Sequence, residues 1–130
     1  MPGAGMKQPK TVYSCIMKKF LQTLETAPDN ITFNDTMSVI DANYDFTPIV
    51  FRNGKLQNEA GQNSGSCKVF SFAKLHQLTP QQTLHCFGSY YCDDVLRHPQ
   101  GSDHQNIRNF IKTGWDGIVF AGNALTPKKE

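Results

Sequence analysis

Apolar residues recur every three or four positions along much of the chain, and this spacing predicts amphipathic helices. The first stretch runs from Val12 to Leu24, and Pro28 ends it. A second helix is expected after Thr32, because Thr32 and Asp35 can form a capping box at its start. Its apolar stripe consists of Phe33, Met37, Ile40 and Tyr44.

Three further helices are expected in the second half of the chain. Residues 67–78 are apolar on nearly all sides, which favours a buried central helix and leaves a strand at 67–72 as the alternative. The segment Thr79-Pro80-Gln81-Gln82 predicts a capped helix that continues along one buried face as far as Val95. The last helix should begin with a capping box of Ser102 and Gln105 and end at Gly114.

Short strands are expected between and after these helices. Residues 47–52 are rich in β-prone side chains, and the Asn53-Gly54 turn leads to a second strand near Leu56. Residues 118–120 form the last strand. The fold class is therefore α+β, with about five helices packed on a small antiparallel sheet of two or three short strands. We expect residues 1–10 to be a flexible lead, 11–123 a single globular domain and 124–130 a tail.

The bulk composition narrows the functional classes. The chain has 130 residues and a net charge of +2, without the clustered basic face that nucleic-acid binding requires. No apolar run is long enough for a membrane span, and the first ten residues lack the apolar core of a secretory signal. The four cysteines have no zinc-ribbon or redox spacing, which indicates reduced thiols and a cytoplasmic protein. We expect a monomer that binds neither nucleic acid nor membrane.

The glycine-rich loop 58–68 is the first candidate site. A loop of this kind that enters a helix can direct free backbone N–H groups at an anion, with Lys68 nearby. It does not match the phosphate-loop pattern, because Ser66 and Cys67 follow Gly65. The alternative is purely structural: Ser64 or Ser66 caps the helix, and the glycines shape a tight turn.

A second candidate combines Cys67 with His104. A thiol at a helix N-terminus can have a lowered pKa, and a histidine is the natural base for it. His104 follows Asp103, whose carboxylate could orient the ring. The structural alternatives are that Cys67 is a small buried hydrophobe, that Asp103 caps a helix and that His104 bonds to a loop.

No metal or other cofactor is expected. Among the possible ligands no pair has a diagnostic spacing, and residues 41–45 lack the later glycine and glutamate of a calcium loop. The ligands considered are Asp41, Asp45, Glu59, Asp103 and His104.

Several of these segments, taken together and in order, resemble the HopJ type III effector family from about Phe33 to Lys128. The similar segments are residues 39–48, 51–54, 58–68, 87–91, 94–96, 103–110 and 114–118. Cys92 is a departure, since a basic residue is expected after the tyrosine pair. The resemblance implies an effector passed into a host cell by a type III system, or a role inside the bacterium, and brings no established reaction, cofactor or catalytic residue.

Two functional hypotheses follow, and enzyme status stays open between them. The preferred one is a binding or effector module whose polar cleft, formed by loop 58–68 and segment 103–108, receives a small anionic ligand or a host or cell protein. The alternative is a thiol-dependent hydrolase or transferase with Cys67 as nucleophile and His104 as base. The predicted ligand-binding residues are Asn58, Glu59, Gly61, Asn63, Gly65, Ser66, Lys68, Asp103, His104 and Arg108.

Overall fold

The computed structural model describes residues 14–128, so the lead expected at residues 1–10 lies outside the described residues. Within this range the five α-helices are α1 (Cys15–Thr26), α2 (Phe33–Asn43), α3 (Ser64–Leu75), α4 (Pro80–His85) and α5 (Gln105–Thr113). Two short 3-10 helices, η1 (Pro28–Asn30) and η3 (Gly114–Gly117), and a π-helix, η2 (Tyr90–Val95), complete the helical elements. The strands are β1 (Tyr44–Phe46), β2 (Phe51–Asn53), β3 (Leu56–Asn58), β4 (Ile118–Phe120) and β5 (Leu125–Pro127).

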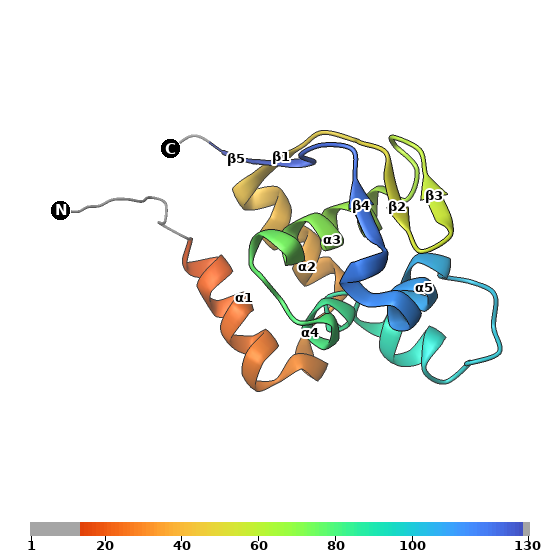
Figure 1. Ribbon diagram of the computed structural model, residues 1–130. Coiled ribbons are helices and arrows are strands. Elements are labelled where there is room, and N and C mark those ends of the chain that lie inside the picture. Colours follow the sequence, from red (N-terminus) through yellow and green to blue (C-terminus); the bar gives the residue numbers. More distant parts are fainter. Residues whose placement is uncertain (1–13, 129–130) are drawn as a thin grey trace.

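The strands form two small antiparallel sheets rather than one. The three-stranded sheet has the order β3-β2-β4, with Arg52 opposite Gln57 on one side and Val119 on the other. The second sheet pairs β1 with β5. The strands gather along one side of the molecule and the helices along the other (Figure 1). The α+β class, the hairpin at Asn53-Gly54 and the strand at 118–120 are as the sequence predicts.

The core is built around α3, which is a helix throughout and not the strand left open by its apolar run. Phe70 has no exposed surface and packs against four aromatic rings from other elements of the chain. Its ring partners are Phe51, Phe87, Phe110 and Trp115. Burial of this many aromatic side chains supplies most of the driving force that holds the helices against the sheet.

Two of the predicted capping boxes are present. Thr32 accepts a hydrogen bond from the Asp35 backbone N–H while the Asp35 carboxylate accepts one from the Thr32 N–H. Thr79 and Gln82 form the same reciprocal pair at α4, with Pro80 at the first helical position. These caps satisfy N–H groups that a helix start otherwise leaves unpaired.

The prediction of one continuous helix from Thr79 to Val95 is wrong, because the helix is interrupted at Gly88. Gly88 has a φ of +59°, and α4 ends before it while the π-helix η2 begins after it. The break arises from close packing. A Cβ on Gly88 would lie 2.7 Å from the backbone nitrogen of Phe33. The apolar residues keep helical spacing across this interruption, so the sequence pattern does not reveal it.

Two helix starts and one chain end also differ from expectation. Asn63, rather than Ser64 or Ser66, is the N-cap of α3, and His104 replaces the predicted box of Ser102 and Gln105 at α5. The Gln105 side chain donates instead to the Ser102 carbonyl. Strand β5 lies within the segment expected to be a tail, because Leu125 is buried and pairs with β1.

Gly88→Ala tests the contact that breaks this helix. A left-handed φ and the clash with the start of α2 should together lower the free energy of unfolding by at least about 2 kcal/mol. Urea denaturation of the variant measures this loss. Gly122→Ala is the matched control, because nothing lies within 4 Å of its added Cβ and its φ is ordinary. An equal change in both variants would contradict the packing explanation.

Candidate functional site

A cleft of about 400 Å³ opens where the first turns of α3 and α5 meet. Loop 58–68 and segment 103–108 therefore lie together, on either side of one hollow. The lining residues are Phe33, Leu56, Asn63, Gly65, Ser66, Phe87, Tyr90, His104, Gln105, Asn106 and Ile107. A larger hollow of about 580 Å³ lies between the end of α3 and residues 118–125; its walls are mainly apolar, although Ser71, Lys74 and Asn123 line it, and neither loop 58–68 nor segment 103–108 reaches it. The smaller cleft is therefore the candidate site.

Both helices start with a residue in the left-handed conformation. Asn63 has φ 54° and ψ 49°, His104 has φ 51° and ψ 49°, and neither makes a side-chain cap bond. Non-glycine residues adopt this conformation at a cost, and such strain often marks a functional site. The first helical bonds come from the N–H groups of Cys67 and Arg108. The N–H groups of residues 64–66 and 105–107 thus have no acceptor within their own helix.

Four asparagines hold the two helix starts in register. The Asn58 side-chain oxygen accepts from the amide groups of Asn63 at 2.7 Å and Asn106 at 3.0 Å. The Asn106 side-chain oxygen accepts in turn from Asn53 at 3.0 Å and Asn58 at 3.2 Å. Asn53 and Asn58 have no exposed surface and Asn106 is buried, so these bonds form in a region of low dielectric. The network joins β2, β3, the 58–68 loop and α5.

His104 is positioned by a carboxylate from η2. Its Nε2 lies 3.0 Å from Asp94 Oδ2, and because a carboxylate only accepts, Nε2 must carry the proton. The ring lies 5.0 Å from the Tyr90 ring at a tilt of 32°. Tyr90 in turn contacts Phe33 at 5.1 Å. The cleft thus has one polar wall of amides and one aromatic wall.

Arg108 organises the loop that leads to His104 rather than the cleft itself. The buried guanidinium donates to the carbonyl oxygens of His98 and Asp103 and to the Asp103 carboxylate. The hydrogen bond from Arg108 is the main cause that lowers the pKa of Asp103 below its ordinary value. Gly101 lies directly against the guanidinium. These contacts fix the path of residues 98–104.

The structure divides the ten predicted ligand-binding residues into two groups. Asn63, Gly65, Ser66 and His104 line the cleft, and Asn58 lies directly behind it in the amide network. The other five do not line it. Lys68 pairs with Asp41 at 2.8 Å, Glu59 and Gly61 lie on the exposed turn, and Asp103 and Arg108 pair with each other.

The thiol hypothesis is not favoured by the geometry. Cys67 is 2% exposed and is not among the residues that line the cleft. Burial raises the pKa of its thiol, and hydrogen bonds with the Ser71 side chain and the Ile49 backbone only partly oppose this. A buried thiol with a raised pKa is a poor nucleophile at neutral pH.

Sequence reasoning missed the aromatic wall and two members of the amide network. Phe33 was assigned only to a helical stripe, Tyr90 appeared only within the family-like segment 87–91, and Asn53 was interpreted as a turn residue. Asn106 was included only as part of the 103–108 segment. A buried asparagine leaves no local signal in a sequence, because its partners come from other elements.

The five side chains considered as metal ligands from the sequence do not form a group of three in the described part of the chain. A different group does come together between residues 14 and 128, namely Asp29, His85 and Cys92. It lies outside the lining of the cleft.

Cysteine alkylation distinguishes a buried Cys67 from a reactive one. With iodoacetamide at pH 6 to 9, we expect Cys67 to stay unlabelled until the protein unfolds, because its sulfur is buried and protonated. Cys15 is exposed and serves as the internal control. Mass spectrometry of each cysteine peptide measures both. Rapid labelling of Cys67 in the folded protein at pH 6 would contradict this assignment.

Asn106→Ala tests whether the amide network supports the cleft. The change removes one donor and one acceptor from buried partners, so the free energy of unfolding should fall by about 2 kcal/mol. Urea denaturation measures the loss. Asn34→Ala, at an exposed position of α2, is the control and should stay within about 0.5 kcal/mol of wild type. A wild-type stability for Asn106→Ala would show that the network is not structural.

Comparisons with known proteins place these features in a wider group. The family model described as HopJ type III effector protein matches residues 17–125. A solved structure titled "Crystal structure of unknown function protein VPA0580" is 54% identical, with a TM-score of 0.85, and the alignment covers 86% of this chain and 93% of that one. A search among curated proteins found no match.

Within residues 14–128, no helix is long and apolar enough to cross a membrane. The family model spans all five α-helices except the first two residues of α1, and it includes both helix starts at the cleft. The resemblance noted from the sequence segments is thereby confirmed, and the chain belongs to the HopJ type III effector protein family.

Proposed function

We propose that this protein is a binding module whose cleft takes up a small anionic ligand between the starts of α3 and α5. One observation carries the proposal: two helix N-termini without side-chain caps open on the same cleft. Helix N-termini carry a partial positive charge and free N–H groups, and together these bind anions.

Among the α-helices of residues 14–128, α3 and α5 are the ones that lack a side-chain cap. Ser14, Thr32 and Thr79 each accept a hydrogen bond from the first turn of α1, α2 and α4. Only α3 and α5 begin with left-handed residues whose side chains are used elsewhere, in bonds to Asn58 and Asp94. An anion in the cleft would supply the acceptor that the other three helices obtain from a side chain.

The surroundings limit what kind of anion fits. No lysine or arginine lines the cleft, since Lys68 pairs with Asp41 and Arg108 with Asp103. Recognition would therefore depend on N–H groups and on the hydroxyl of Ser66 more than on full charges. The rings of Tyr90 and Phe33 offer a stacking surface beside them. A phosphate or carboxylate carried on a flat organic body suits this combination.

The family name suggests the setting in which the module acts. We propose that it is made in the bacterial cytoplasm, is passed into a host cell by a type III system, and binds there a small anionic metabolite or the anionic group of a host protein. The small ligand is the preferred target, because a cleft of about 400 Å³ matches a compact molecule.

Amide shifts during a titration with inorganic phosphate and phenyl phosphate test the proposal. We expect shifts at Gly65, Ser66, Gln105 and Asn106, and tighter binding of phenyl phosphate because its ring can stack on Tyr90. The Gly61 amide, on the exposed turn, is the internal control and should not move. Unmoved cleft amides with both probes at high millimolar concentration would overturn it.

Ser66→Asp provides a second test. A carboxylate in the first turn of α3 occupies the place of the ligand and interacts favourably with the helix dipole. Phosphate binding should weaken at least 10-fold, while the free energy of unfolding rises by about 0.5 kcal/mol. Ser38→Asp, which adds the same charge at an exposed position of α2, should leave binding unchanged. Equal weakening by both variants would indicate only a general charge effect.

A further inference from the structure

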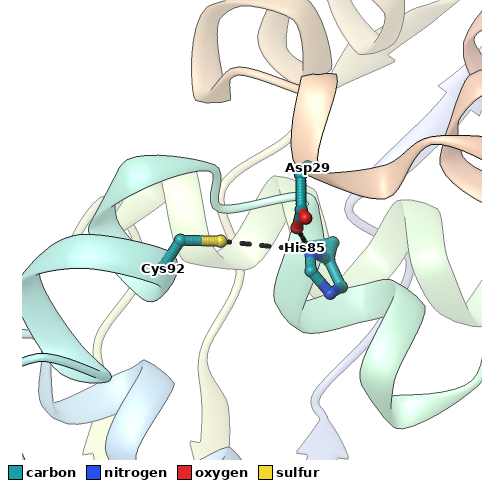
Figure 2. A group of neighbouring side chains, drawn as sticks. All are labelled: Asp29, His85 and Cys92. Atoms are coloured by element: carbon teal, nitrogen blue, oxygen red, sulfur yellow. Dashed lines mark hydrogen bonds and ion pairs between the residues drawn. The ribbon is translucent and has the colours of Figure 1, made fainter.

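Three side chains with metal-binding chemistry meet on the surface away from the cleft. Asp29 comes from η1, His85 is the last residue of α4, and Cys92 lies in the π-helix η2. Their ligand atoms all lie within 4.8 Å of one another, and Asp29 and Cys92 both point toward the His85 ring (Figure 2). The Asp29 carboxylate is 88% exposed, whereas the His85 side chain is only 14% exposed.

The break at Gly88 creates this cluster. Seven residues of continuous α-helix would place His85 and Cys92 on one face but about 10.5 Å apart along the axis. The left-handed turn at Gly88 instead folds η2 back, and Cys92 Sγ comes to 4.0 Å from His85 Nδ1. π-Helical turns are rare in proteins as a whole, and those that occur often lie at functional sites.

The geometry argues against a Cys-His-Asp proton relay. In such a relay the thiol and the carboxylate use different nitrogens of the imidazole. Here Asp29 Oδ1 lies 3.7 Å from Nδ1, the same atom that faces Cys92. Nδ1 can donate to the carboxylate or accept from the thiol, but it cannot do both. Burial, followed by the charges of Asp29 and Asp93, also raises the pKa of the Cys92 thiol, which opposes a free nucleophile.

A single cation would satisfy all three groups at once. Zinc bonds to N and O ligands at about 2.0–2.2 Å and to sulfur at about 2.3 Å, so its tetrahedral ligand atoms lie about 3.3–3.7 Å apart. The separations of 3.7 and 4.0 Å from His85 Nδ1 need only a small contraction, and the third, between Asp29 and Cys92, is at most 4.8 Å and would shorten by up to about 1 Å. Thiolate and imidazole ligands suit zinc rather than the hard cations Mg²⁺ and Ca²⁺.

We propose that Asp29, His85 and Cys92 form a three-ligand site for Zn²⁺, with the fourth position open to water. Binding replaces the thiol proton, which leaves to solvent, by the metal ion. The Cys92 thiolate and the Asp29 carboxylate then balance the two positive charges. The site ties η1 to η2, and η2 also carries Tyr90 and Asp94 to the anion cleft. The metal therefore fixes a helix that shapes the cleft, although the proposal does not depend on what the cleft binds.

Cobalt spectroscopy on the reduced full-length protein tests the site. Co²⁺ should give a thiolate charge-transfer band in the near ultraviolet and the intense visible bands of tetrahedral coordination, and Zn²⁺ should displace both. Cys92→Ser and His85→Gln should weaken Zn²⁺ binding at least 100-fold, since loss of an outer partner alone costs about 10- to 100-fold. Cys15→Ser removes an exposed thiol elsewhere and should leave the spectra unchanged.

Alkylation of the unmodified protein supplies a readout that needs no variant. Zn²⁺ should slow iodoacetamide labelling of Cys92 at least 10-fold and leave Cys15 labelling unaffected. The proposal is overturned if Co²⁺ produces no cysteine-dependent band, if Cys92 is not protected, or if Cys92→Ser binds Zn²⁺ within threefold of wild type. Loss of the band in Cys15→Ser instead would identify adventitious binding and equally reject the site.

Discussion

The buried amide network is the constraint on which the cleft depends. Asn58 and Asn106 exchange hydrogen bonds in a region closed to water, and Asn53 and Asn63 extend the network to β2 and to the start of α3. Buried amides are costly when unpaired, so each bond restricts the relative position of two elements. Apolar packing around Phe70 would allow α3 and α5 to slide slightly against each other. The hydrogen bonds between the asparagine side chains allow one arrangement, in which both helix starts face the same cleft.

That arrangement costs stability locally. Asn63 and His104 both adopt left-handed backbone conformations, and their side chains bond to Asn58 and Asp94 rather than to the first turns of their helices. A helix start in the β-region whose side chain caps the first turn is typically more stable by about 1 kcal/mol than one without such a cap. Strain of this kind persists only where the surroundings over-determine it, which the amide network and the Arg108-bound loop do here. Two helix starts therefore remain without a side-chain cap at the cleft.

Local chemistry was predictable from the sequence and long-range geometry was not. The boxes at Thr32 and Thr79 and the Asn53-Gly54 hairpin depend on neighbours a few residues apart, and each was predicted. The strand at 118–120 was predicted from its own β-prone residues, although its partner β2 lies 65 to 69 residues away in the sequence. The meeting of loop 58–68 with segment 103–108 was also anticipated, through the family resemblance and the polar character of both segments. The aromatic wall, the β1–β5 pair and the contacts of Lys68 with Asp41 and of Arg108 with His98 depend on partners 10 to 83 residues away, and no periodicity encodes such partners.

Gly88 is not apparent in the pattern of apolar residues, yet the turn at Gly88 positions side chains at both the cleft and the Asp29-His85-Cys92 cluster. Leu84, Phe87, Tyr91 and Val95 keep the spacing of a continuous helix and are all buried, so the apolar stripe gives no hint of a break. Only the approach of the α2 backbone, which leaves no room for a Cβ, forces the chain to turn there. The turn directs Tyr90 and Asp94 toward the cleft and Cys92 toward His85, on different sides of the same π-helix. Asp94, whose carboxylate orients His104, lies in the same π-helix as Cys92. Any interaction that fixes Cys92 therefore also restricts the position of that carboxylate.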